Sequence, residues 1–241
     1  MYEASLWNWF AAHFNKLCVP VFLTPPASRA PHSSLIHMFE VVRQEYGAPA
    51  SACYGRMDAD GTWVLDYPVL LAALSSAQDT GRPPLLLGTA FSFVHLLDHL
   101  AENDLRLRLP DGSRVMETGG YKNRSRTMPK SELHALITAR LGVPLENIVC
   151  EYGMSELSSQ AYNTSGHFQF SPWARMQIVS PETGRQVAEG ETGLIRIFDL
   201  ANVFSVAAIQ TEDLGVRRGD GFELIGRAEL AEARGCSLMT A

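Results

Sequence analysis

The stretch Asn147-Ile148-Val149-Cys150-Glu151-Tyr152-Gly153 ends a series of short apolar segments separated by Gly and Pro residues. Hydrophobic spacing predicts strands and helices in alternation through this series. The expected strands cover 19–23, 50–54, 85–88, 113–118 and 147–152, and the expected helices cover 6–17, 34–44, 66–78, 91–101 and 129–141. Such alternation predicts an α/β fold with a mostly parallel sheet and helices on both faces, which binds ligands at the carboxyl ends of its strands.

The texture of the sequence changes at about Phe168. Short apolar segments there are separated by turn sequences at 181–184, 190–193 and 218–221. This pattern predicts a small antiparallel β lobe. We therefore expect an α/β core subdomain over 1–167 and a small β lobe with a C-terminal tail over 168–241.

Composition narrows the class of protein. The chain has 241 residues, of which 46% are hydrophobic, and a formal net charge of -6. The charge gives no reason to expect nucleic-acid binding, which relies on clustered Lys and Arg. No apolar run reaches the roughly 20 residues that span a bilayer. The N-terminus lacks the pattern of a secretory signal, and the scattered cysteines suggest neither zinc nor a disulfide scaffold, so we expect a cytoplasmic protein.

Two motifs fall at strand ends, where ligands are expected. Gly119-Gly120 follows the strand over 113–118, and Glu151-Tyr152-Gly153-Met154-Ser155-Glu156 begins at the end of the strand over 147–152. Further on come Thr211-Glu212-Asp213-Leu214-Gly215 and Gly226-Arg227. Each motif alone is weak, but their ordered occurrence favours a nucleotide pocket.

These motifs resemble those of the acyl-protein synthetase family, the fatty-acid-activating ligases of bacterial bioluminescence, within the adenylate-forming superfamily. The resemblance covers nearly the whole chain. It rests on Met116-Glu117-Thr118-Gly119-Gly120-Tyr121-Lys122, Ser171-Pro172-Trp173-Ala174-Arg175, Glu191-Thr192-Gly193-Leu194, Asp199-Leu200-Ala201-Asn202, Ile209-Gln210-Thr211-Glu212-Asp213-Leu214-Gly215 and Arg234-Gly235-Cys236-Ser237-Leu238. It implies AMP-forming activation of a carboxylic acid, for example a fatty acid, by ATP and Mg²⁺, followed by transfer to a thiol or acyl-accepting protein.

The resemblance also implies roles for the motif residues. Gly119 and Gly120 would form the wall of the adenine pocket, because absent side chains let a ring approach the backbone. Tyr152, followed by Gly153, would stack on adenine. Lys122 would offset phosphate charge.

The remaining implied roles concern ribose, phosphate and metal. Ser155 would contact a phosphate, and Glu156 would hold Mg²⁺, a hard cation that prefers oxygen ligands. Asp213 would accept hydrogen bonds from the ribose hydroxyls, and Arg227 would bind ribose or phosphate.

Each of these residues also has a purely structural interpretation. Tyr152 could pack a strand end, Glu156 could favour the first turn of a helix, and Asp213 could be a turn residue. Cys236, near the C-terminus in a Gly-Cys context, would by resemblance carry the acyl group as a thioester. Its alternative is a spare cysteine in a tail.

The sequence departs from the family in two ways. The Gly-, Ser- and Thr-rich phosphate loop expected upstream and the C-terminal lid with a catalytic lysine are both missing from this sequence. We therefore expect weak catalysis by this chain alone and completion by another polypeptide or a homo-oligomer. The aromatic residues of the 6–17 helix would form the docking surface, unless that helix packs on its own sheet.

The sequence is compatible with three functions. The first is an ATP-dependent acid-thiol ligase. The second is a catalytically impaired pseudo-ligase that binds a nucleotide or acyl group or completes a partner. The third is a Cys236 acyl carrier or transferase that does not use ATP.

Overall fold

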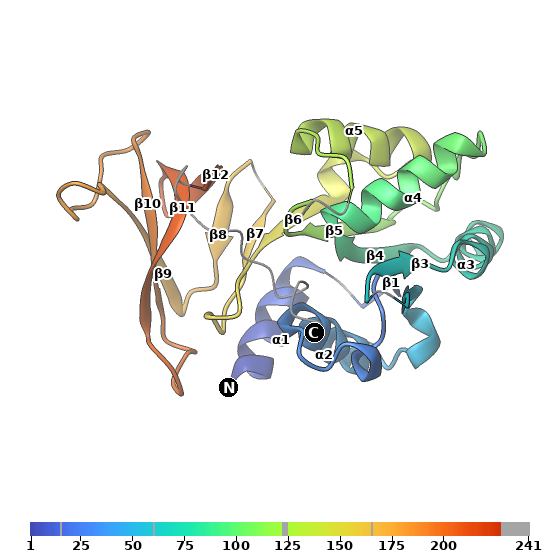
Figure 1. Cartoon of the computed structure of the whole chain (residues 1–241), viewed down its shortest axis with the longest axis horizontal. Helices are drawn as coiled ribbons and strands as arrows, with labels where there is room; N and C mark the ends of the chain where they lie inside the picture. Colours follow the sequence, from blue (N-terminus) through green and yellow to red (C-terminus); the bar gives the residue numbers. More distant parts are fainter. Residues whose placement is uncertain (15, 60, 122–124, 165, 228–241) are drawn as a thin grey trace. The chain divides into compact units, whose positions relative to one another are not determined.

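The computed structural model describes residues 1–241 except 15, 60, 122–124, 165 and 228–241, and these residues form two compact units. Unit 1 comprises Met1–His13 and residues 151–227, and unit 2 comprises residues 14–150. Strand β6 (Ile148–Tyr152) carries the chain from unit 2 into unit 1 (Figure 1).

Unit 2 is built on parallel strands in the order β1-β4-β5-β6. Strand β4 (Pro84–Thr89) pairs in parallel with β1 (Val19–Phe22) and with β5 (Arg114–Thr118). A separate antiparallel hairpin joins β2 (Gly55–Met57) to β3 (Trp63–Leu65). The helices are α2 (Ser34–Glu45), α3 (Tyr67–Thr80), α4 (Ala90–Glu102) and α5 (Lys130–Leu141), with short 3₁₀ turns at Ala27–Arg29, Ala50–Ala52 and Leu145–Asn147.

Local sequence signals begin and end these helices. Ser33, Asp66 and Thr89 each accept a backbone N–H at the start of α2, α3 and α4. Such caps satisfy donors that have no partner within the helix. Gly81 and Gly142 end α3 and α5 in the left-handed conformation that glycine adopts without strain.

The unit 2 strands bury both faces. Val21, Leu86 and Val115 pack with the apolar residues of α4 and α5 in one core cluster. The next residue along β1, Phe22, contacts Phe39 of α2 instead, with ring centroids 5.6 Å apart. Alternate residues of a strand point to opposite faces, so the sheet has α4 and α5 on one face and α2 on the other (Figure 1). The predicted α/β class is confirmed.

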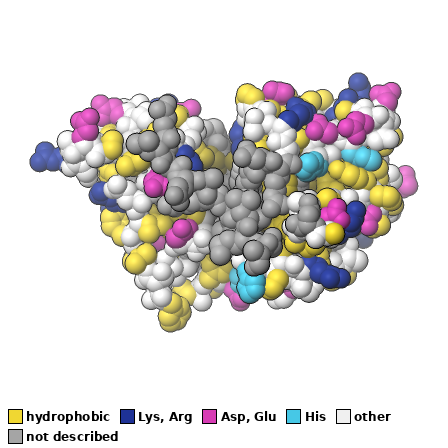
Figure 2. Space-filling view, in the orientation of Figure 1, with side chains coloured by type: hydrophobic (Ala, Val, Ile, Leu, Met, Phe, Trp, Pro, Cys, Tyr) yellow, Lys and Arg dark blue, Asp and Glu magenta, His cyan; other side chains and the backbone are white. Residues whose placement is uncertain are grey.

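Unit 1 contains an antiparallel sheet in the order β7-β8-β12-β11-β10-β9. Its strands are β7 (Ala161–Asn163), β8 (Phe168–Phe170), β9 (Ala174–Val179), β10 (Thr192–Asp199), β11 (Ala208–Arg218) and β12 (Gly221–Arg227). The loop between β10 and β11 carries exposed apolar side chains, including Phe204, which is 94% exposed. Figure 2 shows the hydrophobic and charged side chains on one face of the molecule. Among the described helices, none is long and apolar enough to cross a membrane.

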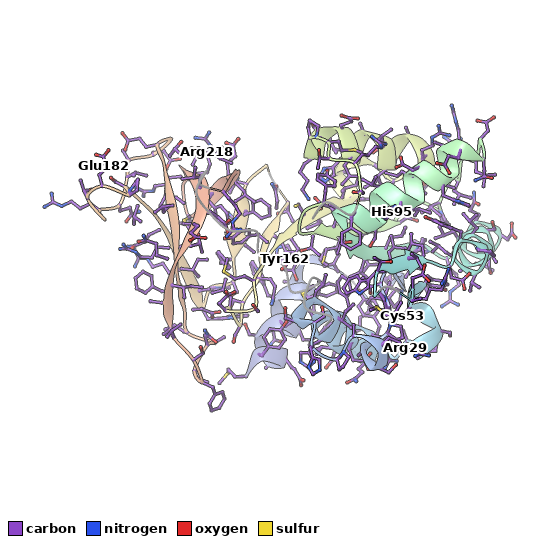
Figure 3. The ribbon with its side chains drawn as sticks, in the orientation of Figure 1. Arg29, Cys53, His95, Tyr162, Glu182 and Arg218 are labelled. Atoms are coloured by element: carbon purple, nitrogen blue, oxygen red, sulfur yellow. The ribbon has the colours of Figure 1, made fainter. Side chains whose placement is uncertain are left out.

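Helix α1 (Tyr2–His13) packs within unit 1. Leu6 and Phe10 are fully buried, and the rings of Phe10 and His13 contact the ring of Tyr162 on β7. Tyr162, which is labelled in Figure 3, is also fully buried. Trp9 contacts Trp173 edge to face. The expectation of an exposed aromatic docking surface on this helix is wrong, because Phe10 is buried and Trp9 packs against Trp173 of the same unit.

The structure differs from the expected element or unit bounds by more than two residues in three places. Helix α1 occupies Tyr2–His13 rather than 6–17, with Glu3 in the first turn, where the helix dipole favours an acid. Residues 50–54 form a 3₁₀ turn and a single bridge from Cys53 to Phe22 rather than a strand. The division between units falls at 150/151 instead of 167/168, because β7 pairs with β8 and α1 joins the same unit.

Gly193 gives a test of the unit 1 sheet. A Cβ atom at this position would lie 2.4 Å from the carbonyl oxygen of Val179 on β9. Because backbone cannot yield as a side chain can, we expect Gly193→Ala to lower the free energy of unfolding by about 2 kcal/mol. Urea unfolding measures this value. Gly120→Ala is the control, since a Cβ there meets nothing within 4 Å among the described residues. Equal stability of the two variants would contradict the prediction.

Candidate functional site

Three of the predicted site residues meet in unit 1. The hydroxyl of Tyr152, at the end of β6, donates to Oδ2 of Asp213 at 2.8 Å. Nε of Arg227 lies 3.4 Å from Oδ1 of the same carboxylate, and its Nη2 donates to Glu212 at 3.0 Å. The Asp213 carboxylate on β11 therefore contacts both the Tyr152 hydroxyl on β6 and the Arg227 guanidinium on β12.

A register shift places Arg227 opposite Asp213. From the turn outward, Arg218 pairs with Gly221 and Gly215 with Leu224. The pairing then shifts by one residue between Leu214 and Gly215, so that Asp213 faces Arg227 rather than Gly226. An extra residue on one strand is a β-bulge, a device that re-aims side chains near functional sites.

The Asp213 carboxylate keeps acceptor capacity in this arrangement. An ionised carboxylate offers about four lone-pair positions, and Tyr152 and Arg227 take one each. The Asp213 side chain is 18% exposed, so the remaining positions are open to solvent or a ligand. The arrangement can therefore accept hydrogen bonds from a pair of hydroxyl groups.

The ring of Tyr152 is held by other aromatic residues. It contacts the rings of Phe168, Phe170 and Phe222 edge to face, with centroids 5.3 to 6.2 Å apart. Tyr152 is only 8% exposed. This is the packing that the structural interpretation of Tyr152 predicts, and it also fixes the position from which the hydroxyl reaches Asp213.

Gly153 follows Tyr152 at a point where a larger residue would require the Glu151 side chain to move. A Cβ there would lie 2.4 Å from Oε1 of the buried Glu151. Two residues on, the exposed Ser155 hydroxyl donates to Oε2 of Glu156 at 3.2 Å. An exposed carboxylate beside a hydroxyl presents the oxygen atoms that Mg²⁺ prefers.

Sequence reasoning missed what anchors this loop. Asn202 donates to the backbone oxygen of Glu156, and Ser158 and Ser159 donate to the buried carboxylate of Asp199 at 2.8 Å. The signal was present in Asp199-Leu200-Ala201-Asn202, which carried the family resemblance without a role. The structure gives these residues a role, because they fix the backbone that presents Ser155 and Glu156.

The glycine pair lies in unit 2, directly after β5. Gly119 has φ of 67°, a left-handed conformation that favours glycine. A Cβ at either Gly119 or Gly120 would meet nothing within 4 Å among the described residues, so a flat group has room beside this backbone. The predicted site residues Lys122 and Cys236 lie outside the described residues.

Unit 2 also holds a charged cluster that sequence reasoning missed. The fully buried Glu117 carboxylate contacts Lys130 and, at 3.2 Å, Nε2 of His134. Burial by itself raises the pKa of Glu117, but the Lys130 ammonium and hydrogen bonds from His134 and Cys150 hold that pKa below its usual value. Glu117 is in the family motif, yet a single acid on a strand gives no signal of its partners. In the described chain, no cluster of His, Cys, Asp and Glu suits a metal ion.

Tyr152→Phe tests the hydroxyl that joins β6 to Asp213. The change keeps the ring packing and removes one bond to a charged acceptor, so we expect the free energy of unfolding to fall by about 1.5 kcal/mol. The measurement is urea unfolding. Tyr67→Phe is the matched control, because the Tyr67 hydroxyl donates to a neutral carbonyl at 3.3 Å and should matter less. A loss for Tyr152→Phe no greater than the control would refute the assignment.

Known proteins similar to this chain identify its family. The family model described as acyl-protein synthetase, LuxE, matches residues 25–241. The long-chain-fatty-acid–luciferin-component ligase of Aliivibrio fischeri is 24% identical over an alignment of 192 residues that covers 73% of this chain and 50% of that protein. The same-named ligase of Vibrio harveyi is 22% identical over an alignment of 185 residues that covers 72% of this chain and 49% of that protein. The chain thus spans about half the length of these curated relatives.

Solved structures share the fold. ATP-bound MatB from Rhodopseudomonas palustris has a TM-score of 0.59 at 16% identity, covering 94% of this chain and 44% of that protein. O-succinylbenzoate coenzyme A synthetase (MenE) from Bacillus subtilis in complex with AMP has a TM-score of 0.55 at 16% identity, with the same two coverages. The chain has the α/β fold of adenylate-forming enzymes, and it belongs to the LuxE acyl-protein synthetase family.

Proposed function

We propose that this protein takes part in AMP-forming activation of a carboxylic acid, for example a long-chain fatty acid, and in its transfer to a thiol. The observation that carries the proposal is the convergence of Tyr152 and Arg227 on the Asp213 carboxylate, in a chain that belongs to this family. The names of the curated relatives support a fatty acid as substrate and a protein as acyl acceptor.

The chemistry needs positioning and charge neutralisation. An oxygen of the substrate carboxylate attacks the α-phosphorus of ATP, and pyrophosphate leaves with the electrons of the broken P–O bond. A thiolate then attacks the acyl carbon, and AMP leaves. The protein's part is to align the reactants and to stabilise developing negative charge, and no base from the protein is required.

Each proposed role fits a local feature. The open acceptor positions of Asp213 suit the two ribose hydroxyls, and Arg227 is near enough to add a charge-assisted bond. In unit 2, the bare backbone at Gly119 and Gly120 suits the adenine ring. Tyr152 contributes by orienting Asp213, in addition to the adenine stacking that the family resemblance implies for it.

Other roles concern phosphate and metal. The exposed Glu156 carboxylate is proposed to hold Mg²⁺, which when bound neutralises phosphate charge, and the exposed Ser155 hydroxyl is proposed to contact a phosphate. Lys122 is proposed to add positive charge, on sequence resemblance alone. Cys236 is proposed as the acyl-carrying thiol on the same ground.

Nucleotide binding tests the first part of the proposal. The full chain should bind AMP in calorimetry, and Asp213→Ala should weaken binding about tenfold or more, because hydrogen bonds to a charged group are each worth about 1.5–3 kcal/mol. Asp213→Asn separates loss of charge from loss of shape. The control is Asp220→Ala, an exposed turn residue of the same unit. Wild-type protein that binds neither AMP nor ATP at millimolar concentration would sink the proposal.

Acyl transfer tests the second part. Full chain incubated with preformed radiolabelled fatty acyl-adenylate should gain a label that hydroxylamine releases, and Cys236→Ser should lose it. Cys53→Ser is the matched control, because burial raises the pKa of the Cys53 thiol to about 11 and leaves it protonated. A label that survives in Cys236→Ser would assign the thiol elsewhere.

The two remaining functions give different results in the same assays. A pseudo-ligase would bind AMP yet release no pyrophosphate with acid and ATP. A carrier that does not use ATP would take the label from an acyl thioester and fail to bind AMP. We also propose completion by another polypeptide or a second copy of the chain. Adding that polypeptide would raise pyrophosphate release without changing the contacts of Asp213.

A further inference from the structure

Helix α5 carries a side-chain clamp on the turn that follows β5. Lys130, the first residue of α5, and His134, one turn later, both point to the fully buried Glu117 on β5. Residues four apart lie on one face of a helix, so α5 presents both groups to the same carboxylate. Each oxygen of Glu117 thus contacts one of these side chains, Oε2 with Lys130 and Oε1 with His134.

Lys130 has a second acceptor. Its Nζ donates to the carbonyl oxygen of Gly119 at 3.0 Å, while it also donates to Glu117. Gly119 is two residues from Glu117 and begins the turn after the strand. One ammonium group therefore links the buried strand residue, the start of α5 and the backbone of the glycine pair.

The clamp is ionised at neutral pH. The pKa of Glu117 is held below its usual value, as described above. Burial lowers the pKa of Lys130, but the Glu117 carboxylate outweighs burial, so that pKa lies above its usual value. An ammonium group donates up to three strong bonds and has no acceptor role, so it holds the Gly119 carbonyl in one direction.

Stability alone does not account for this arrangement. A buried ion pair is often no more stabilising than apolar side chains of the same volume, and apolar neighbours are abundant in this core. What an apolar pair could not do is bond the Gly119 carbonyl. With φ of 67° and no Cβ, Gly119 has more backbone freedom than a residue with a side chain, and its carbonyl is held from outside the turn by Lys130.

We propose that Lys130 is a positioning residue that clamps the Gly119 carbonyl and so holds the Gly119-Gly120 backbone in the conformation that receives the adenine ring. The inference rests on the proposed function for its ligand. Glu117 orients the ammonium, and His134 orients Glu117. Removing the clamp frees the turn, and the nucleotide must then order it on binding.

Lys130→Met removes the clamp, and two measurements on the full chain follow it. Amide exchange of residues 117–121 should accelerate about tenfold, and the dissociation constant for AMP should rise about tenfold. Lys130→Arg should restore both values to within about threefold, because a guanidinium can still donate to both acceptors. Lys16→Met is the matched control, since Lys16 also bonds a backbone carbonyl and a glutamate of unit 2, at Glu45, and should change neither value.

Two further arms keep the result decisive. If Lys130→Met does not fold, the double variant Glu117→Gln with Lys130→Met removes both charges, and the same two changes are expected of it. If wild-type protein does not bind AMP, the proposed function fails, and the exchange measurement still tests the clamp. Wild-type exchange and wild-type AMP affinity in a folded Lys130→Met or double variant would overturn the inference, as would an equal effect of Lys16→Met.

Discussion

The buried carboxylate of Asp199 is the constraint on which the rest of unit 1 depends. It is 1% exposed and accepts bonds from the Ser158 amide, the Ser159 hydroxyl and the Ala201 amide. Ser159 in turn contacts the Ser5 hydroxyl, 3.1 Å away on α1. A carboxylate buried without these donors would cost several kcal/mol, so the loop after β6, the end of β10 and α1 must form together. The hydrogen bonds to Asp199 and from Asn202 fix the backbone around Ser155 and Glu156, whose side chains contact each other.

The two units solve the same electrostatic problem in different ways. Asp199 is satisfied by neutral donors, which tie neighbouring backbone segments together at fixed angles. Glu117 is satisfied by Lys130 and His134, two groups that can carry charge, and the ammonium shares its bonds with a backbone carbonyl. Neutral donors make Asp199 a permanent part of the scaffold. The Lys130 ammonium has several donors, so it can bond Glu117 and the Gly119 carbonyl of the turn at the same time.

The sequence alone predicted the fold better than the site. Hydrophobic periodicity and Gly or Pro signals located β4, α4 and α5, because buried helices and strands impose their own spacing on the chain. The same logic failed at residues 50–54, where a short apolar run forms a 3₁₀ turn. It also failed at α1, whose rings are buried on strands that lie some 150 residues further along the chain. Tyr152, Asp213 and Arg227 were found by resemblance, and their meeting depends on a one-residue bulge that no periodicity reveals.

Glycine shows most clearly where sequence reasoning stops. Gly193 is required by the protein itself, since a Cβ there would strike the Val179 carbonyl at 2.4 Å, and at Gly153 a Cβ would force the Glu151 side chain to move. Gly119 and Gly120 face open space, so packing among the described residues does not require them. In a sequence all four look alike, and only the surroundings of the missing Cβ separate them. A glycine that packing does not need either serves backbone conformation, as the φ of Gly119 indicates, or leaves room for something else. Gly120 has no such φ, and among the described residues no atom lies within 4 Å of the place where its Cβ would be.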